Sequence, residues 1–212
     1  MKGMRILAGI ILFGSLWGMM ECVLGDYLHN QGIWAGAIMT GFMGFGLMAI
    51  SRRMYGVRGM QLGMGLIAGV LKYIHPVGGC MLCSAIAIAF EGAVFEIIWY
   101  SPKLNMNRMN WLMKASMGVI SGYIIYSAGY VITHILTPVV ASAPLYLSDL
   151  AGVMPVIFSS ATIAGLAGGL TLSAVQIPSD FAMRVTNAKK EIYYPVAYAV
   201  SAFCWIGTII LS

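Results

Sequence analysis

The chain has 212 residues, of which 60% are hydrophobic and only 9% are charged, whereas about 25% of the residues of a soluble domain are charged. This composition excludes a soluble globular fold, because too little polar surface remains to cover it, and predicts an all-α polytopic bundle in the lipid bilayer. The net charge of +5 does not indicate a nucleic-acid partner, since the basic residues lie in short loops between apolar runs.

Apolar runs separated by short polar loops follow one another along the chain. The first, residues 6–24, is longer than the core of a signal peptide, about 7–15 residues, and lacks a clear cleavage site, so we interpret it as a retained helix. The others are residues 33–50, 60–73, 80–100, 115–136, 152–175 and 195–212. The third run is short, and the last is close to the minimum of about 17 residues for crossing a bilayer. Six to seven transmembrane helices are therefore predicted.

The basic residues indicate how these helices are oriented. If the N-terminus is cytoplasmic, 11 of the 12 basic residues lie on the cytoplasmic side: Lys2, Arg5, Arg52, Arg53, Arg58, Lys103, Arg108, Lys114, Arg184, Lys189 and Lys190. The exception is Lys72, at the outer end of the third run. This bias predicts a protein of the plasma (inner) membrane with its N-terminus inside. We expect residues 1–212 to form one integral membrane domain, with a core at 5–175 and an additional C-terminal helix at 195–212.

Polar side chains of separate segments fall at one depth near the outer face. On the predicted spans these residues are Glu21, His29, Lys72, His75, Cys80, Cys83 and His134. Glu91 lies about 16 Å below the outer edge, near the midplane, where a carboxyl group must be neutral, paired or in contact with water. Lys72 is its candidate partner, and such a pair could bind a solute or simply lock two helices together. Glu96 lies deeper, and we expect it to reach the inner headgroups.

Aromatic residues of the fifth run form a stripe with a histidine at its end. Tyr123, Tyr126, Tyr130 and His134 are spaced by three, four and four residues, so they share one helical face. Such a face suits a planar, partly polar ligand. The alternative is a packing face whose hydroxyl groups bond to neighbouring helices.

The turn between the third and fourth runs offers a second kind of chemistry. His75, Cys80 and Cys83 have the spacing of a metal half-site for a soft metal, although a closed zinc site needs four ligands. The Cys80–Cys83 pair also suits thiol redox chemistry. Cys22 and Cys204 stand alone in separate spans and are expected in the core, whereas redox enzymes of this kind need a second exposed cysteine pair. A simple disulfide or two buried thiols is therefore the favoured interpretation of Cys80 and Cys83.

The whole pattern resembles the substrate-binding S components of energy-coupling-factor vitamin transporters. The resemblance covers residues 5–175 and rests on three features: the small residues Ala8, Gly14 and Gly18 of the first helix, the basic segment 52–59, and the glycine-rich hairpin 60–98 that contains residues 91–96. It implies a six-helix core that binds a vitamin or metal-related solute from outside, between the outer loops and helices four to six. It also implies that the first helix docks a transmembrane coupling subunit driven by ATPases on other chains.

The leading hypothesis is therefore a solute-binding subunit of a micronutrient transporter with an outward-facing pocket. The sequence leaves open whether the protein is an enzyme and favours the interpretation that it is not. Its predicted solute-binding residues are Glu21, His29, Lys72, His75, Glu91, Tyr126, Tyr130 and His134. We expect Lys72 to hold an anionic group and Glu91 to orient the ligand or pair with Lys72. The alternatives are a metal-binding or thiol-redox protein centred on His75, Cys80 and Cys83, and a structural subunit of a membrane complex. The sequence identifies neither the solute nor any cofactor.

Overall fold

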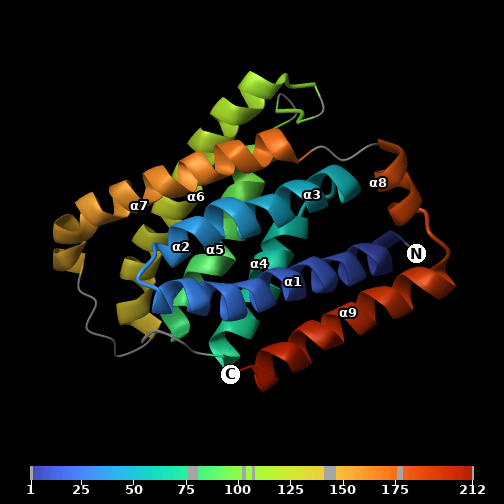
Figure 1. Ribbon diagram of the computed structural model, residues 1–212, viewed down its shortest axis with the longest axis horizontal. Helices are drawn as coiled ribbons and strands as arrows, with labels where there is room; N and C mark the ends of the chain where they lie inside the picture. Colours follow the sequence, from blue (N-terminus) through green and yellow to red (C-terminus); the bar gives the residue numbers. More distant parts are fainter. Residues whose placement is uncertain are drawn as a thin grey trace.

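The computed structural model describes residues 2–75, 81–101, 104–106, 108–140, 147–175 and 179–211, and these contain helices and no strand. The helices are α1 (Lys2–Asn30), α2 (Ala35–Ile38), the π-helix η1 (Met39–Gly44), α3 (Phe45–Tyr55), α4 (Met60–Ile74), α5 (Met81–Trp99), α6 (Trp111–Val140), α7 (Leu147–Ala174), α8 (Ser179–Thr186) and α9 (Lys190–Ile210). They form one bundle (Figure 1), so the all-α prediction is confirmed.

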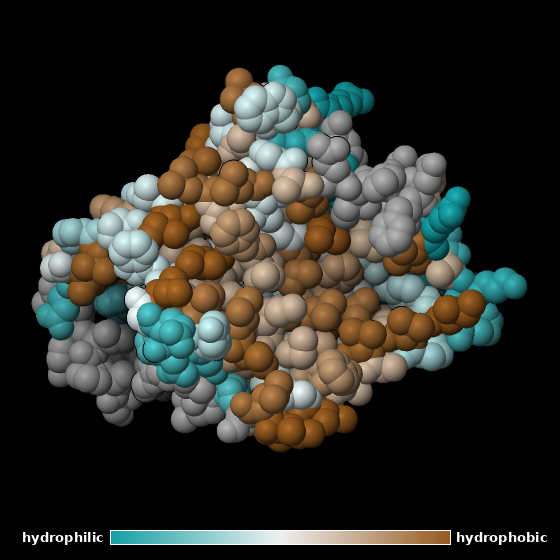
Figure 2. Space-filling view, viewed as in Figure 1, coloured by the Kyte–Doolittle hydropathy of each residue, from teal (hydrophilic) through white to brown (hydrophobic). Residues whose placement is uncertain are grey.

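Six helical segments of the described chain are long and apolar enough to cross a membrane. They are Gly3–Asn30, Ala35–Tyr55, Leu82–Trp99, Trp111–Leu136, Asp149–Ala174 and Lys190–Ile210. The segment Met60–Ile74 is apolar but has only 15 residues. Figure 2 shows hydrophobic side chains over the middle of the visible face and hydrophilic ones gathered toward its two ends. The protein is thus a membrane-spanning helical bundle.

Helix α1 differs from its predicted length in a way that matters for function. It continues without a break to Asn30, whereas the polarity of residues 25–32 predicts a loop from Gly25 onward. Residues 25–30 thus add polar turns to α1 beyond its apolar residues 6–24. Asp26 and His29 are therefore helical residues with fixed directions, not loop residues.

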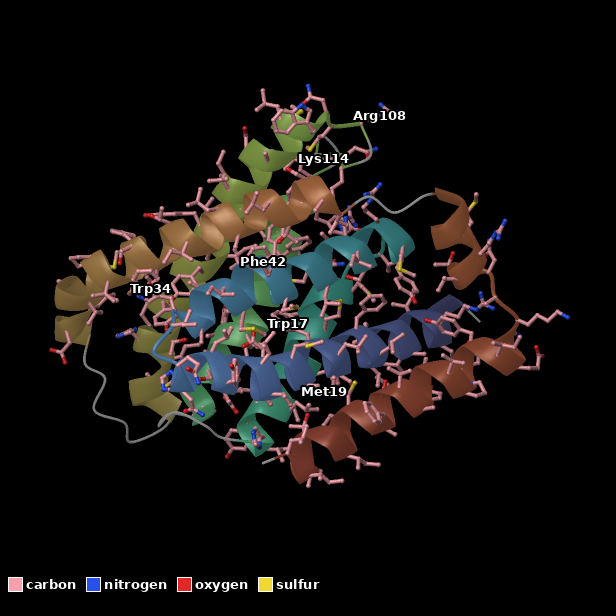
Figure 3. The ribbon with its side chains drawn as sticks, in the orientation of Figure 1. Trp17, Met19, Trp34, Phe42, Arg108 and Lys114 are labelled. Atoms are coloured by element: carbon pink, nitrogen blue, oxygen red, sulfur yellow. The ribbon has the colours of Figure 1, made fainter. Side chains whose placement is uncertain are left out.

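Helix α9 packs along α1 and runs in the same direction (Figure 1). The hydroxyl group of Tyr193 donates to the Arg5 carbonyl oxygen (3.2 Å) near one end, and the Trp205 indole donates to Ser15 Oγ (2.9 Å) further along. In Figure 3, Met19 lies on the side of α1 that faces α9, and Trp17 points into the bundle. The additional C-terminal helix is thus packed against the core of the bundle.

The small residues of α1 are in contact with other helices of the same chain. A Cβ added at Gly14 would lie 2.7 Å from Ile67 Cβ, and one at Gly18 would lie 2.8 Å from Leu71 Cβ, so both glycines allow close packing against α4. Ala8 is fully buried in a cluster with Tyr193 and Ala197 of α9. The positions that the family resemblance would assign to docking another subunit are therefore covered within this chain.

Glu96 has a role different from the predicted one. Its carboxylate accepts hydrogen bonds from the backbone N–H groups of Gly59 and of Leu62 (3.1 Å for the latter). These N–H groups belong to the start of α4 and have no partner within the helix. Glu96 therefore caps the N-terminus of α4, a role that the sequence did not predict, and the expectation that it reaches the lipid headgroups stays a prediction.

Glycines bring two helix pairs into backbone contact. A Cβ at Gly92 of α5 would lie 2.4 Å from the Gln61 carbonyl oxygen of α4, and a Cβ at Gly118 of α6 would lie 2.5 Å from the Gly168 carbonyl oxygen of α7. Small residues at such crossings are the usual means of helix association in membranes. These contacts fix how α4, α5 and α6 are rotated, and hence which of their side chains face one another.

Candidate functional site

A cavity of about 380 Å³ lies within the bundle, among α1, the α2–η1 segment, α4, α5 and α6. Its described lining residues are Glu21, Gly25, Asp26, His29, Ala35, Gly36, Met39, Thr40, Lys72, Cys83, Ser84, Ala87, Ile88, Glu91, Tyr126, Tyr130, Thr133 and His134. The volume falls in the range of small-molecule pockets, about 300–1,000 Å³. Every predicted solute-binding residue except His75 lines it. None of these lining residues belongs to α7, although the family resemblance implied a contribution from the sixth span.

The extended α1 supplies one wall of the cavity. Glu21, Gly25 and His29 recur every four residues and share one helical face, and Asp26, three residues before His29, lines the cavity with them. The Glu21 carboxyl group accepts a hydrogen bond from the Trp17 indole one turn earlier (3.1 Å). Because Gly25 has no side chain, the space beside the Glu21 carboxyl group remains open.

Lys72 is paired with Asp26 and not with Glu91. Its ammonium group lies 2.8 Å from Asp26 Oδ1 and also donates to the Glu21 carbonyl oxygen (3.2 Å). The second oxygen of Asp26 lies 3.2 Å from His75 Nε2. The Asp26 carboxylate thus links the C-terminal ends of α1 and α4. His75 contacts this carboxylate but does not itself line the cavity. The predicted Lys72–Glu91 pair is not formed.

Asp26 is the main residue of the site that sequence reasoning missed. The polarity around it predicts a loop, and the direction of a loop side chain cannot be predicted. A signal is nevertheless present, because Glu21, Gly25 and His29 continue the helical repeat past residue 24. An α1 that continues to His29 on that repeat also fixes the direction of Asp26, which lies three residues before His29 and lines the cavity with it.

Glu91 is buried, with 6% of its surface exposed, and only one of its oxygens has a partner among the described residues. Oε1 accepts a hydrogen bond from the Thr40 hydroxyl (2.7 Å), while Oε2 has no such hydrogen-bond partner. Thr40 lies in η1, and π-helical turns occur often at functional sites. The wider turn aims a hydroxyl group at the carboxyl group, a contact that no feature of the sequence predicted.

The predicted aromatic stripe divides between two environments. The rings of Tyr126 and Tyr130 lie 4.7 Å apart at 30° and line the cavity. His134 Nδ1 lies 2.9 Å from the Tyr130 carbonyl oxygen, which can only accept, so a neutral His134 has Nε2 as an acceptor. Tyr123 instead stacks on Phe158 of α7, with ring centroids 6.2 Å apart. The stripe is therefore partly a wall of the cavity and partly a packing face.

The cysteines have different states. Cys83 is disulfide-bonded and lines the cavity, while Cys80 lies outside the described residues. Cys22 and Cys204 are free and buried, as expected for core residues. A disulfide sulfur is no longer a thiolate, which a soft metal site requires, and the described residues contain no group of three or more His, Cys, Asp or Glu side chains suited to a metal ion.

The site has the chemistry of a binding pocket. It combines the carboxyl groups of Glu21, Asp26 and Glu91 with two tyrosine rings and two histidines, inside a membrane-spanning bundle. Comparisons of this chain with protein-family models, with curated proteins and with solved structures give no match, and the function must be argued from the site itself.

Proposed function

We propose that this protein is the solute-binding subunit of a membrane transporter for a micronutrient. The observation that supports this function is the cavity, in which ionisable side chains of α1, α4, α5 and α6 face one partly open space. Ionisable groups within membrane helices are costly and usually mark solute pathways or binding sites. The volume of about 380 Å³ suits a small organic molecule.

The distribution of basic residues supports a cavity that opens to the non-cytoplasmic side of the plasma membrane. The cavity residues of α6 lie near its C-terminal end, whereas Lys114 lies near the other end of that helix. Figure 3 shows Arg108 and Lys114 far from Trp34, which directly precedes the cavity-lining helix α2. Basic residues favour the cytoplasmic side, so the N-terminus would also be inside.

A subunit of this kind would work with a transmembrane coupling subunit and ATPases on other chains. Because α4 and α9 cover the small residues of α1, such a partner would have to use another face of the bundle. Many large side chains of α7 and α9 are exposed, among them Val156, Leu170 and Phe203, and these would contact lipid or that partner.

Native mass spectrometry of protein purified in a mild detergent would test the proposal. We expect a small molecule to be released on activation in the gas phase. Gly36→Leu is a matched variant that should lose it, because a Cβ at Gly36 already lies 3.7 Å from Tyr130 Oη and a larger side chain would enter the cavity. If the protein retains no small molecule and its thermal stability responds to no member of a broad solute library, the proposal is wrong.

Cysteine labelling in intact cells would test the orientation. With both free cysteines replaced by serine, His29→Cys should react with a membrane-impermeant maleimide added outside, and Arg58→Cys should react only after permeabilisation. The reverse pattern would place the cavity on the cytoplasmic side.

A further inference from the structure

We propose that the solute is a cation: a flat molecule that carries an amidinium, a protonated amine or a heteroaromatic cation. This inference rests on the proposed function and specifies the substrate class of the same site. It reverses the expectation from sequence, in which Lys72 was to hold an anionic group. The reversal follows from where the charges of the cavity are paired.

The positive charge of Lys72 is already engaged. Its ammonium group contacts the Asp26 carboxylate and the Glu21 carbonyl oxygen, and His75 contacts the same carboxylate. An anionic solute would have to compete with Asp26 for both groups. It would also have to approach the carboxyl groups of Glu21 and Glu91, which line the same cavity.

The carboxyl groups of Glu21 and Glu91, in contrast, can still accept hydrogen bonds from a solute. The described hydrogen-bond partners of Glu21 and Glu91 are the Trp17 indole and the Thr40 hydroxyl, which are neutral donors. Within the described chain Glu91 Oε2 has no partner although the side chain is buried. A buried carboxylate without a countercharge is unfavourable, and a cationic solute would supply both the charge and the missing hydrogen-bond donor.

The aromatic wall favours the same class of solute. Cations are attracted to the faces of tyrosine rings, and Tyr126 and Tyr130 lie side by side at the cavity. His134 Nε2 adds an acceptor in the neutral imidazole. Carboxyl groups, ring faces and an imidazole acceptor together select a planar molecule with several N–H donors.

Three flat probes of nearly equal size separate charge from shape: benzamidinium, benzamide and benzoate. We would measure their binding to the full chain in detergent micelles by thermal stabilisation and by displacement of the retained solute. Benzamidinium should bind roughly tenfold to hundredfold more tightly than benzamide, the difference expected for a charge-assisted hydrogen bond. Benzoate should not bind measurably.

Matched variants link this preference to the cavity. Glu91→Gln keeps an oxygen for the Thr40 hydroxyl but removes the charge, so benzamidinium should lose its advantage over benzamide. Glu21→Gln should also reduce the affinity of benzamidinium relative to that of benzamide. It provides an independent test if Glu91→Gln does not fold. Glu191→Gln removes a carboxylate from the exposed first turn of α9 and should leave probe binding unchanged.

The outcomes distinguish the two proposals. Binding of benzoate equal to or stronger than that of benzamidinium, or a retained solute that mass spectrometry identifies as an anion, would overturn the cation inference and leave solute binding intact. An equal loss of benzamidinium binding in Glu191→Gln would also overturn it, because the preference would then not come from the cavity. If no probe binds and no solute is retained, the proposed function fails and this inference fails with it.

Discussion

Separating Lys72 from Asp26 should destabilise the protein, and the size of the effect can be worked out from the structure. The two groups lie 2.8 Å apart with side chains only 9% and 15% exposed, so this is a buried ion pair. Removing one partner of such a pair costs about 3–5 kcal/mol, because a buried charge is left behind. Asp26→Asn should fall in that range, since Lys72 would keep only neutral acceptors, the new amide oxygen and the Glu21 carbonyl oxygen. Lys72→Met should cost about 3 kcal/mol, at the low end of the range, because His75 still contacts Asp26.

The double variant measures the energetic coupling between Lys72 and Asp26. Asp26→Asn with Lys72→Met removes both charges, so its loss of stability should be smaller than the sum of the single losses by about 1–3 kcal/mol. The free energy of unfolding would be measured by titrating SDS into mild detergent and following tryptophan fluorescence. The control cycle combines Lys72→Met with Glu91→Gln, which share no hydrogen-bond partner among the described residues, and should be additive within about 0.5 kcal/mol. Coupling of Lys72 with Glu91 but not with Asp26 would refute the pairing.

Three further predictions concern packing, capping and the cavity. Gly92→Ala should lower the free energy of unfolding by about 1–3 kcal/mol, because the new Cβ meets the Gln61 carbonyl oxygen at 2.4 Å. Gly3→Ala, which meets nothing within 4 Å, should not lower it, and equal losses would contradict the packing argument. Glu96→Ala should cost about 1 kcal/mol through the lost cap of α4 and speed hydrogen exchange at the Leu62 amide, whereas Glu191→Ala should do neither. Gly36→Leu should weaken benzamidinium binding about tenfold or more without a matching loss of thermal stability, and unchanged affinity would place the binding site elsewhere.

Helical repeats account for the part of the site that could be predicted. Along one helix, the repeat fixes which residues share a face and at what depth they lie. That is why Glu21, His29, Lys72 and His134 could be placed at one level near the outer face, with Glu91 deeper, and all of these residues line the cavity. Asp26 belongs to the same continuous helix, and the sequence prediction missed it because the polar character of residues 25–32 favours a loop.

The sequence by itself determined that the chain is an all-α membrane bundle, because 60% of its residues are hydrophobic and only 9% are charged, and its long uninterrupted apolar runs can satisfy their own backbone hydrogen bonds in lipid as helices. Only the tertiary structure decided which charges meet. Glycine contacts between helices and the π-helical turn at Thr40 set the rotation of each helix. That rotation depends on contacts between segments far apart in sequence, so it joined Lys72 to Asp26 and left Glu91 facing the cavity with an oxygen that no described residue pairs.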